Sequence, residues 1–330
     1  MWSRRRGRCA GWSCALPELH PQAVALVGPT ASGKSAVAIE AALRDGDVEI
    51  VSIDSMAVYR RMDIGTATPT VAERSGVPHH LLDVLEPWDD CTMSLFQDLA
   101  LAAVDDIELR GRIPLLVGGT GLYHRAVIDR LDIPGQYPSV RMALEAEATL
   151  PGGPSALHAR LVGLDPVAAG RIEPGNVRRI VRALEVCEGA GVPFSSFGPG
   201  LEEYPPASIA QVGLLPDLEA VLDAVERRIR GWVDAGLLDE VAALVDDRRG
   251  LSRTAAQAIG YREIIDHLSG AITLDEAIAE TIRRTRVLVR RQISWFRRDP
   301  RIRWATTREG AATALGEALA EARRPTQVRD

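Results

Sequence analysis

Lysine is almost absent from this 330-residue sequence, in which arginine supplies all but one of the 39 basic side chains. The single lysine is Lys34, so its position calls for a specific explanation. Positive charge is not in excess either, because 45 acidic residues give a formal charge of −6 and exclude a uniformly basic nucleic-acid coat protein. With 46% hydrophobic and 25% charged residues, the composition is that of a globular protein rather than a disordered or collagen-like chain.

Long apolar segments and paired cysteines are also missing. No apolar run approaches the roughly 20 residues that a membrane-spanning helix needs, and residues 1–20 contain arginines but no apolar core of a signal peptide. The four cysteines show neither the density of a disulfide scaffold nor Cys-x-x-Cys spacing. We therefore expect a cytoplasmic protein with reduced thiols and no membrane segment, in which residues 1–20 form a disordered extension.

Short apolar runs that alternate with helical segments predict an α/β protein with a doubly wound parallel sheet. The runs lie at 23–27, 48–53, 113–117 and 209–215. Between 136 and 204, helical segments broken by prolines predict an inserted helical subdomain, and the chain after 217 is mostly helical in pattern. The expected organisation is a catalytic core at 21–135 and 205–305, an insert at 136–204, and a peripheral helix or tail at 306–330.

The first apolar run leads into a phosphate-binding loop. Gly28-Pro29-Thr30-Ala31-Ser32-Gly33-Lys34-Ser35 fits the pattern G-x-x-x-x-G-K-[ST] between a predicted strand and a predicted helix. Backbone N–H groups and the helix N-terminus would bind a phosphate, Lys34 would supply an ammonium group, and the Ser35 hydroxyl would ligate Mg²⁺. The loop predicts a phosphorylated ligand but does not say whether the phosphoryl group is transferred, hydrolysed or released.

Two further positions belong to the same edge of the predicted sheet. Asp54 follows the second strand, where open α/β sheets place their ligands, and it fits a Mg²⁺ ligand, a general base or a helix N-cap. Gly118-Gly119-Thr120-Gly121 follows the third strand and puts a hydroxyl there. That hydroxyl could bind phosphate, but alone the segment favours a plain strand-to-helix turn.

Basic residues are concentrated near the C-terminus. Residues 281–304 hold nine arginines and one acid, Asp299, for a local charge of +8 in an otherwise acidic chain. Apolar residues recur there at helical spacing, which predicts a basic helix with one docked face. Interleaved aromatics such as Trp295 and Trp304 suit contacts to phosphates and bases of RNA. The alternative is a solvated helix whose arginines pair with acids elsewhere in the fold.

Taken together, the motifs resemble the tRNA dimethylallyltransferases, also called tRNA isopentenyltransferases or the IPP transferase family. The resemblance spans most of the chain and runs through eight ordered segments at 28–35, 54–59, 62–67, 77–83, 117–123, 176–186, 258–263 and 291–300. Ala57 and Thr68 depart from the common family pattern, in which Gln and Lys are frequent, so the side-chain contacts of those two positions do not carry over directly.

The resemblance implies transfer of a dimethylallyl group from dimethylallyl diphosphate to N6 of the adenosine 3′-adjacent to the anticodon, with release of diphosphate and with Mg²⁺ as cofactor. The phosphate loop, residues 28–35, would then hold the diphosphate leaving group. Asp54, Lys34 and Thr120 would be catalytic, with Asp54 accepting the proton of the adenine amine. The adenosine would have to leave its stack in the loop to reach the site.

The resemblance also implies contacts to the tRNA anticodon stem-loop, with the insert at 136–204 binding the stem-loop. We expect the enzyme to be a monomer. Carried over by position, the contact residues are Asp54, Ser55, Met56, Ala57, Thr120, Arg141, Arg178, Arg179, Arg182, Gln257, Gly260, Tyr261, Arg262, Arg286, Arg290 and Arg291.

Three alternatives use the same phosphate loop. An adenylate isopentenyltransferase would act on a free nucleotide and would need neither the insert nor the basic segment. A small-molecule kinase would bind ATP and need a phosphoryl-acceptor pocket. An RNA-binding ATPase would hydrolyse ATP without any prenyl transfer.

Overall fold

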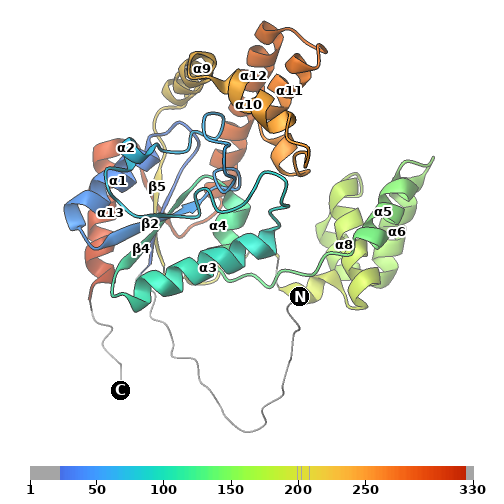
Figure 1. The fold of residues 1–330 in the computed structure, drawn as a ribbon. Helices are drawn as coiled ribbons and strands as arrows, with labels where there is room; N and C mark the ends of the chain where they lie inside the picture. Colours follow the sequence, from blue (N-terminus) through green and yellow to red (C-terminus); the bar gives the residue numbers. More distant parts are fainter. Residues whose placement is uncertain (1–22, 199, 202, 208, 325–330) are drawn as a thin grey trace, which may run out of the picture.

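The computed structural model describes residues 23–324 except 199, 202 and 208, so the expected disordered extension at 1–20 lies outside the described residues. A single sheet of six parallel strands, in the order β3-β2-β4-β1-β5-β6, forms the centre of the molecule (Figure 1). The strands are β1 (Val24–Val27), β2 (Val48–Ile53), β3 (His79–His80), β4 (Ile113–Gly118), β5 (Ala210–Leu214) and β6 (Ile302–Ala305). The predicted doubly wound α/β fold is confirmed.

The central strands form where apolar runs become buried on both faces. Every residue of β1, β2 and β4 is buried, as expected for a parallel sheet that is covered on both sides. The sequence analysis missed β3 and β6. The first has only two residues, and in the second, an edge strand, only Ile302 is buried, so neither carries an apolar run.

Helices cover both faces of the sheet. On one face, α1 (Lys34–Asp45) packs beside α13 (Arg308–Ala322), and on the other α3 (Met93–Leu109) packs with α4 (Gly121–Ile128). Helix α13 differs from the expected peripheral helix or tail, because Ala311, Leu315, Ala318 and Leu319 are fully buried against α1 and the sheet. Its apolar face is built mostly of alanine, so the Ala/Glu-rich composition concealed it.

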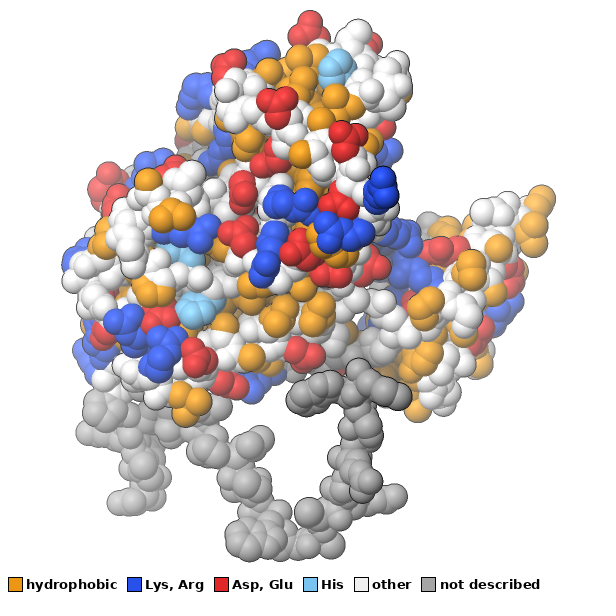
Figure 2. Space-filling model, in the orientation of Figure 1, with side chains coloured by type: hydrophobic (Ala, Val, Ile, Leu, Met, Phe, Trp, Pro, Cys, Tyr) orange, Lys and Arg blue, Asp and Glu red, His pale blue; other side chains and the backbone are white. Residues whose placement is uncertain are grey.

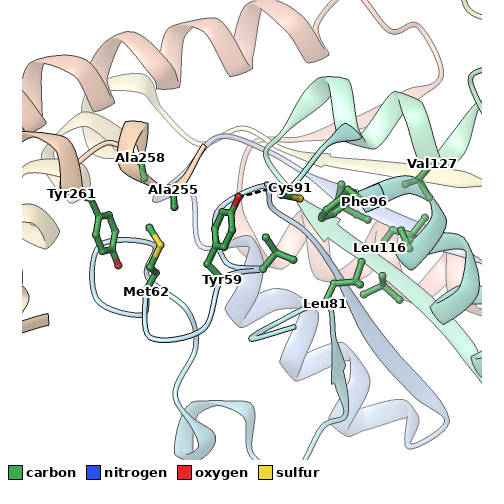
Figure 3. Packing of buried hydrophobic residues seen from close by; sticks show 14 of the residues in the cluster. Tyr59, Met62, Leu81, Cys91, Phe96, Leu116, Val127, Ala255, Ala258 and Tyr261 are labelled. Carbon is green, nitrogen blue, oxygen red and sulfur yellow. Dashed lines mark hydrogen bonds between the residues drawn. The ribbon is translucent and has the colours of Figure 1, made fainter. Parts of the chain in front are cut away.

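Four helices follow β5 beyond the carboxyl edge of the sheet: α9 (Leu218–Asp234), α10 (Leu237–Val245), α11 (Tyr261–Leu268) and α12 (Leu274–Phe296), with a short 3₁₀ turn η2 (Ala255–Gln257) before α11. The loop after β2, which includes the short helix α2 (Val71–Arg74), docks against them. Figure 3 shows Tyr261 facing Met62, and Tyr59 hydrogen-bonded to the backbone N–H of Cys91 at 3.2 Å. The expected basic helix over 281–304 ends at Phe296, because Pro300 disfavours helical geometry at Asp299.

The insert is a separate bundle of α5 (Pro138–Ala148), α6 (Gly153–Leu164), α7 (Pro166–Arg171) and α8 (Val177–Ala190), followed by the 3₁₀ turn η1 (Phe194–Phe197). Its own core includes Leu157, Leu161 and Leu184, all fully buried. Prolines lie in the first turn of α5, α6 and α7, where the missing N–H costs nothing. The bundle stands apart from the sheet (Figure 1). Among the described helices, none is both long and apolar enough to cross a membrane.

Candidate active site

The phosphate loop has the geometry of an anion-binding turn. Gly33 adopts a left-handed conformation with φ 91°, and α1 begins at the next residue, Lys34. The loop therefore directs the N-terminus of α1 toward its own concave side. The hydroxyl of Ser32 is buried and has no hydrogen-bond partner within the part of the chain that the structure describes. A buried hydroxyl that lacks a partner fits a ligand oxygen in this turn.

Lys34 lies inside the loop and donates a hydrogen bond from Nζ to the carbonyl oxygen of Pro29 at 3.2 Å. Burial lowers the pKa of its ammonium group from 10.5 to about 8, although the Asp54 carboxylate opposes the shift and Arg228 adds to it. The loop thus holds a cation whose charge is poorly compensated by the protein. A bound diphosphate would supply the missing negative charge.

Asp54 follows β2 and meets the phosphate loop at the carboxyl edge of the sheet. Its Oδ1 accepts hydrogen bonds from the N–H groups of Met56 at 2.8 Å and Ala57 at 3.4 Å, which closes the turn after the strand. The cap-like role that the sequence left open is therefore present, but it uses only one carboxylate oxygen. Among the described residues, none donates a hydrogen bond to Oδ2.

Thr120 joins this group from the end of β4. Its Oγ1 accepts a hydrogen bond from the N–H of Ser55 at 3.4 Å, so the loops after β2 and β4 are in direct contact. The close approach depends on Gly118, where an added Cβ would lie 2.1 Å from the carbonyl oxygen of Ile53. The structure therefore brings Lys34, Asp54 and Thr120 together.

Three side chains at this site were missed in the sequence analysis. Gln292 of α12 accepts a hydrogen bond from the N–H of Thr30 at 2.9 Å and donates one to the carbonyl oxygen of Gly119 at 2.9 Å, so it ties the phosphate loop to the loop after β4. Arg228 of α9 reaches the Thr30 hydroxyl at 3.5 Å.

Arg308, at the start of α13, is the third. Its guanidinium group covers Gly33, where an added Cβ would lie 2.5 Å from Nε. Nothing in the sequence separates Arg228 or Arg308 from other arginines of their helices. Gln292 does lie within the family-like segment 291–300, which was the one signal that could have found it.

Comparisons with known proteins agree on one family. The family model described as IPP transferase matches residues 57–299. A tRNA dimethylallyltransferase of Salinispora arenicola is 52% identical over 282 residues, covering 85% of this chain and 81% of that relative. This chain belongs to the IPP transferase family.

Solved structures of the IPP transferase family share the fold. A tRNA isopentenylpyrophosphate transferase from Bacillus halodurans is 37% identical with a TM-score of 0.65, over 91% of this chain and 97% of that one. A eukaryotic dimethylallyltransferase described as acting on tRNA has a TM-score of 0.73 at 23% identity, over 93% of this chain and 81% of that one. That second likeness concerns the fold alone.

The basic segment of this IPP transferase divides into paired and unpaired arginines. Five of the nine are engaged within the fold: Arg283 with Glu280, Arg284 with Glu263, Arg286 with Glu226, Arg301 with Asp129 and Asp299, and Arg303 with Glu317. The other four, Arg290, Arg291, Arg297 and Arg298, are exposed and form no ion pair with any described residue. The alternative of internal ion pairs is therefore confirmed for five of the arginines, and RNA contact by the other four stays a prediction.

Three residues expected to contact RNA are engaged within the fold. Tyr261 is fully buried with its hydroxyl 2.6 Å from Glu240, and Gly260 is buried against Trp232. Arg182 donates to the carbonyl oxygens of Pro134 and Gly135. The family-like segments that contain them do not by themselves distinguish a packing role from an RNA contact.

The remaining RNA candidates differ in exposure. Arg178, Arg179, Gln257 and Arg262 are exposed, whereas Arg141 is half-buried beside Glu145 at 2.9 Å. Ala57 and Thr68, the two departures from the family pattern, are both buried. On the face shown in Figure 2, basic side chains gather where the sheet, the upper helices and the insert meet, interleaved with acidic ones.

Proposed function

We propose that this IPP transferase is a tRNA dimethylallyltransferase, which moves the dimethylallyl group of dimethylallyl diphosphate to N6 of the adenosine 3′-adjacent to the anticodon. The observation that carries the proposal is the meeting of Lys34, Asp54 and Thr120 at one edge of the sheet in a chain of this family. The nitrogen would attack the allylic carbon, the carbon–oxygen bond would break, and diphosphate would leave with the electron pair.

The diphosphate is the ligand of the phosphate loop. The buried Ser32 hydroxyl and the Lys34 ammonium group point to an oxyanion there, and Arg228 adds a second cation beside Thr30. Because these donors are fixed before the reaction, they stabilise the negative charge that develops on the leaving oxygen without having to reorganise. Gln292 keeps the two loops that form the site in register.

Asp54 is the general base. The exocyclic amine of adenine is a weak nucleophile, so a carboxylate that removes its proton during the attack accelerates the reaction by about 10²–10⁴-fold. Oδ1 is held by two backbone N–H groups, which orients Oδ2 toward the incoming amine. Thr120, anchored at Ser55, contacts the diphosphate or the base from the opposite loop.

Mg²⁺ is the cofactor that this chemistry implies, and the donors present fit it. The Ser35 hydroxyl would hold the ion together with diphosphate oxygens and water, since Mg²⁺ keeps several waters and takes few protein ligands. The described residues include no cluster of three or more His, Cys, Asp or Glu side chains that would hold a metal alone. When bound, the ion would neutralise charge on the leaving diphosphate.

The tRNA anticodon stem-loop is the acceptor. The exposed arginines Arg290 and Arg291 of α12 and Arg178 and Arg179 of α8 are the cations that would contact its phosphates from the core and the insert. The insert at 136–204 would grip the stem, and the adenosine would flip into the site. That the enzyme acts as a monomer in the cytoplasm remains a prediction.

The test is incubation of the purified protein and Mg²⁺ with radiolabelled dimethylallyl diphosphate and unmodified tRNA, with AMP as acceptor in a parallel reaction. Label in tRNA alone supports the proposal, and chelation of Mg²⁺ should abolish it. Label in AMP would identify an adenylate isopentenyltransferase. Consumption of [γ-³²P]ATP with label in neither acceptor would assign the loop to a kinase or an ATPase.

A further inference from the structure

Four charged side chains are largely buried together where the insert joins the core. Arg125 of α4 and Asp129, directly after that helix, pair with each other and are 2% and 3% exposed, and Arg301, 13% exposed, pairs with Asp129 at 2.7 Å and with Asp299 at 2.7 Å. The charges of this buried quartet balance. Burying ions costs several kcal/mol each before their attraction offsets it, so such a quartet is weak evidence for stability and calls for another role.

The buried quartet also holds the chain segment that returns from the insert. Arg125 donates to the carbonyl oxygens of Leu201 at 3.1 Å and Glu203 at 2.7 Å, and Arg301 donates to that of Pro205 at 2.8 Å. Both guanidinium groups lie over the ring of Tyr204, at 4.5 Å and 5.6 Å from its centroid. The returning segment is therefore fixed by its backbone and by one aromatic side chain.

The outgoing segment starts at the same place. Asp129 caps the C-terminus of α4, and two residues later the carbonyl oxygen of Leu131 accepts a hydrogen bond from Gln97 of α3 at 3.0 Å. On the insert side, Arg182 donates a hydrogen bond to the carbonyl oxygen of Pro134 at 2.7 Å, and Glu185 accepts one from the N–H of Tyr137 at 2.8 Å. Since the insert helices pack mainly on one another, these two segments set the position of the insert.

Two elements of the active site end at the quartet. Helix α4 begins directly after Thr120 and ends at Ile128, next to its C-cap Asp129, and the segment after α12, the helix that carries Gln292, supplies Asp299 and Arg301. A helix is stiff over this length, so the quartet keeps a fixed spacing to the loops around the phosphate site. The quartet is thus connected to the insert on one side and to the catalytic edge on the other.

We propose that the quartet and Tyr204 form a positioning joint that fixes the orientation of the insert relative to the catalytic edge, so that a bound tRNA presents its adenosine to Asp54. The inference rests on the proposed function for its kinetic consequence. None of the five residues belongs to the candidate active site described above, so the role proposed for them is positioning. Tyr204 is the residue to change, because removing its ring leaves all four buried charges and their ion pairs in place.

The experiment compares Tyr204→Ala and Tyr204→Leu with Tyr204→Phe in the full chain. Loss of the ring should raise KM for tRNA about tenfold, with KM for dimethylallyl diphosphate and kcat at saturating tRNA within twofold of wild type. Tyr204→Phe keeps the ring and should match wild type. An unchanged KM for tRNA in both ring-less variants, or an equal defect in Tyr204→Phe, would overturn the proposal.

A second readout does not depend on activity. Spin labels at Glu40→Cys on α1 and Ala159→Cys on α6, with Cys9 and Cys14 replaced by serine, report the distance between core and insert. The joint predicts a broader distance distribution in Tyr204→Ala than in wild type, with the thermal unfolding midpoint of the core unchanged within a few degrees. An identical distribution would refute the joint, whereas a wild-type enzyme that labels no tRNA would refute only the proposed function.

Discussion

An acidic side chain lies near each end of β2, and the two carboxylates differ in how many hydrogen-bond and ion-pair partners they have. Glu49, near the start of the strand, is 2% exposed and is held by Arg110, Arg112 at 2.9 Å and His80 at 2.7 Å. Asp54, just after its end, uses one oxygen on backbone N–H groups and faces Lys34 across the site. The residues are five positions apart, yet one is fully satisfied by its neighbours and the other is not.

The difference shows in the charges that surround them. Hydrogen bonds from Arg110, and further ones from His80 and Arg112, lower the pKa of the Glu49 carboxyl group from 4.5 to about 2. At the other end, the positive charge of Lys34 is not fully compensated by the protein, because burial lowers the pKa of its ammonium group to about 8. Saturated charge stabilises a fold, whereas under-compensated charge is what binds an anionic ligand.

The largest expected effect is on the chemistry at the carboxyl end. Asp54→Asn preserves the turn, since the amide oxygen still accepts from Met56 and Ala57, but it removes the proton acceptor. We expect kcat to fall about 10²–10⁴-fold with tRNA affinity within a few-fold of wild type. Steady-state labelling and filter binding would measure both. Wild-type turnover in the variant would remove Asp54 as the base.

At the other end of β2 the expected loss is stability. Glu49→Gln leaves Arg112 without a carboxylate, whereas Arg110 keeps Asp106 at 2.8 Å. Both arginines are partly exposed and stay hydrated, so the free energy of unfolding should fall by about 2 kcal/mol. Urea unfolding measures it, and kcat should stay within twofold.

The pH dependence of unfolding gives Glu49→Gln a second check. Because the pKa of Glu49 is lower in the folded state, its contribution is complete above about pH 4.5 and is lost as the pH falls toward 2. The difference in the free energy of unfolding between wild type and Glu49→Gln should therefore shrink as the pH falls from 4.5 to 2. A constant difference between the two proteins down to pH 2 would contradict the assignment.

The lowered pKa of Lys34 predicts that ligand binding depends on pH. A bound diphosphate stabilises the ammonium form, so the pKa rises in the complex and binding takes up a proton above about pH 8. Diphosphate affinity should then fall up to tenfold per pH unit between pH 8 and 10. Calorimetry in two buffers of different ionisation enthalpy would detect the proton uptake. Lys34→Arg, which stays charged, is the control and should lack this slope.

The smallest expected effect is on tRNA affinity, and it should differ between arginines of α12 that form an ion pair and those that do not. Neutralising Arg290 and Arg291 to glutamine should weaken tRNA binding several-fold and reduce the salt slope by about 1–2. Arg283→Gln, which removes an arginine already paired with Glu280 at 2.6 Å, is the matched control and should change the slope less. Equal slopes for wild type and the double variant would count against α12 as an RNA surface.

The sequence alone predicted the positions of those site residues that lie in a contiguous motif or directly after a strand. The phosphate loop is eight consecutive residues, and Asp54 and Thr120 follow strands whose carboxyl ends must meet at one edge. Sequence reasoning failed where the role depends on packing. Arg228 and Arg308 reach the loop from α9 and α13, and Tyr261 lies inside the core against Gly65, which no spacing along the chain reveals.

The contrast between the ends of β2 is tested most directly by single-turnover transfer of labelled dimethylallyl to tRNA by Asp54→Asn and Glu49→Gln, side by side at neutral pH and 25 °C. Saturating both substrates isolates the chemical step. The account predicts a rate at least 100-fold below wild type for Asp54→Asn and a rate within twofold of wild type for folded Glu49→Gln. Similar rates for the two variants would contradict it.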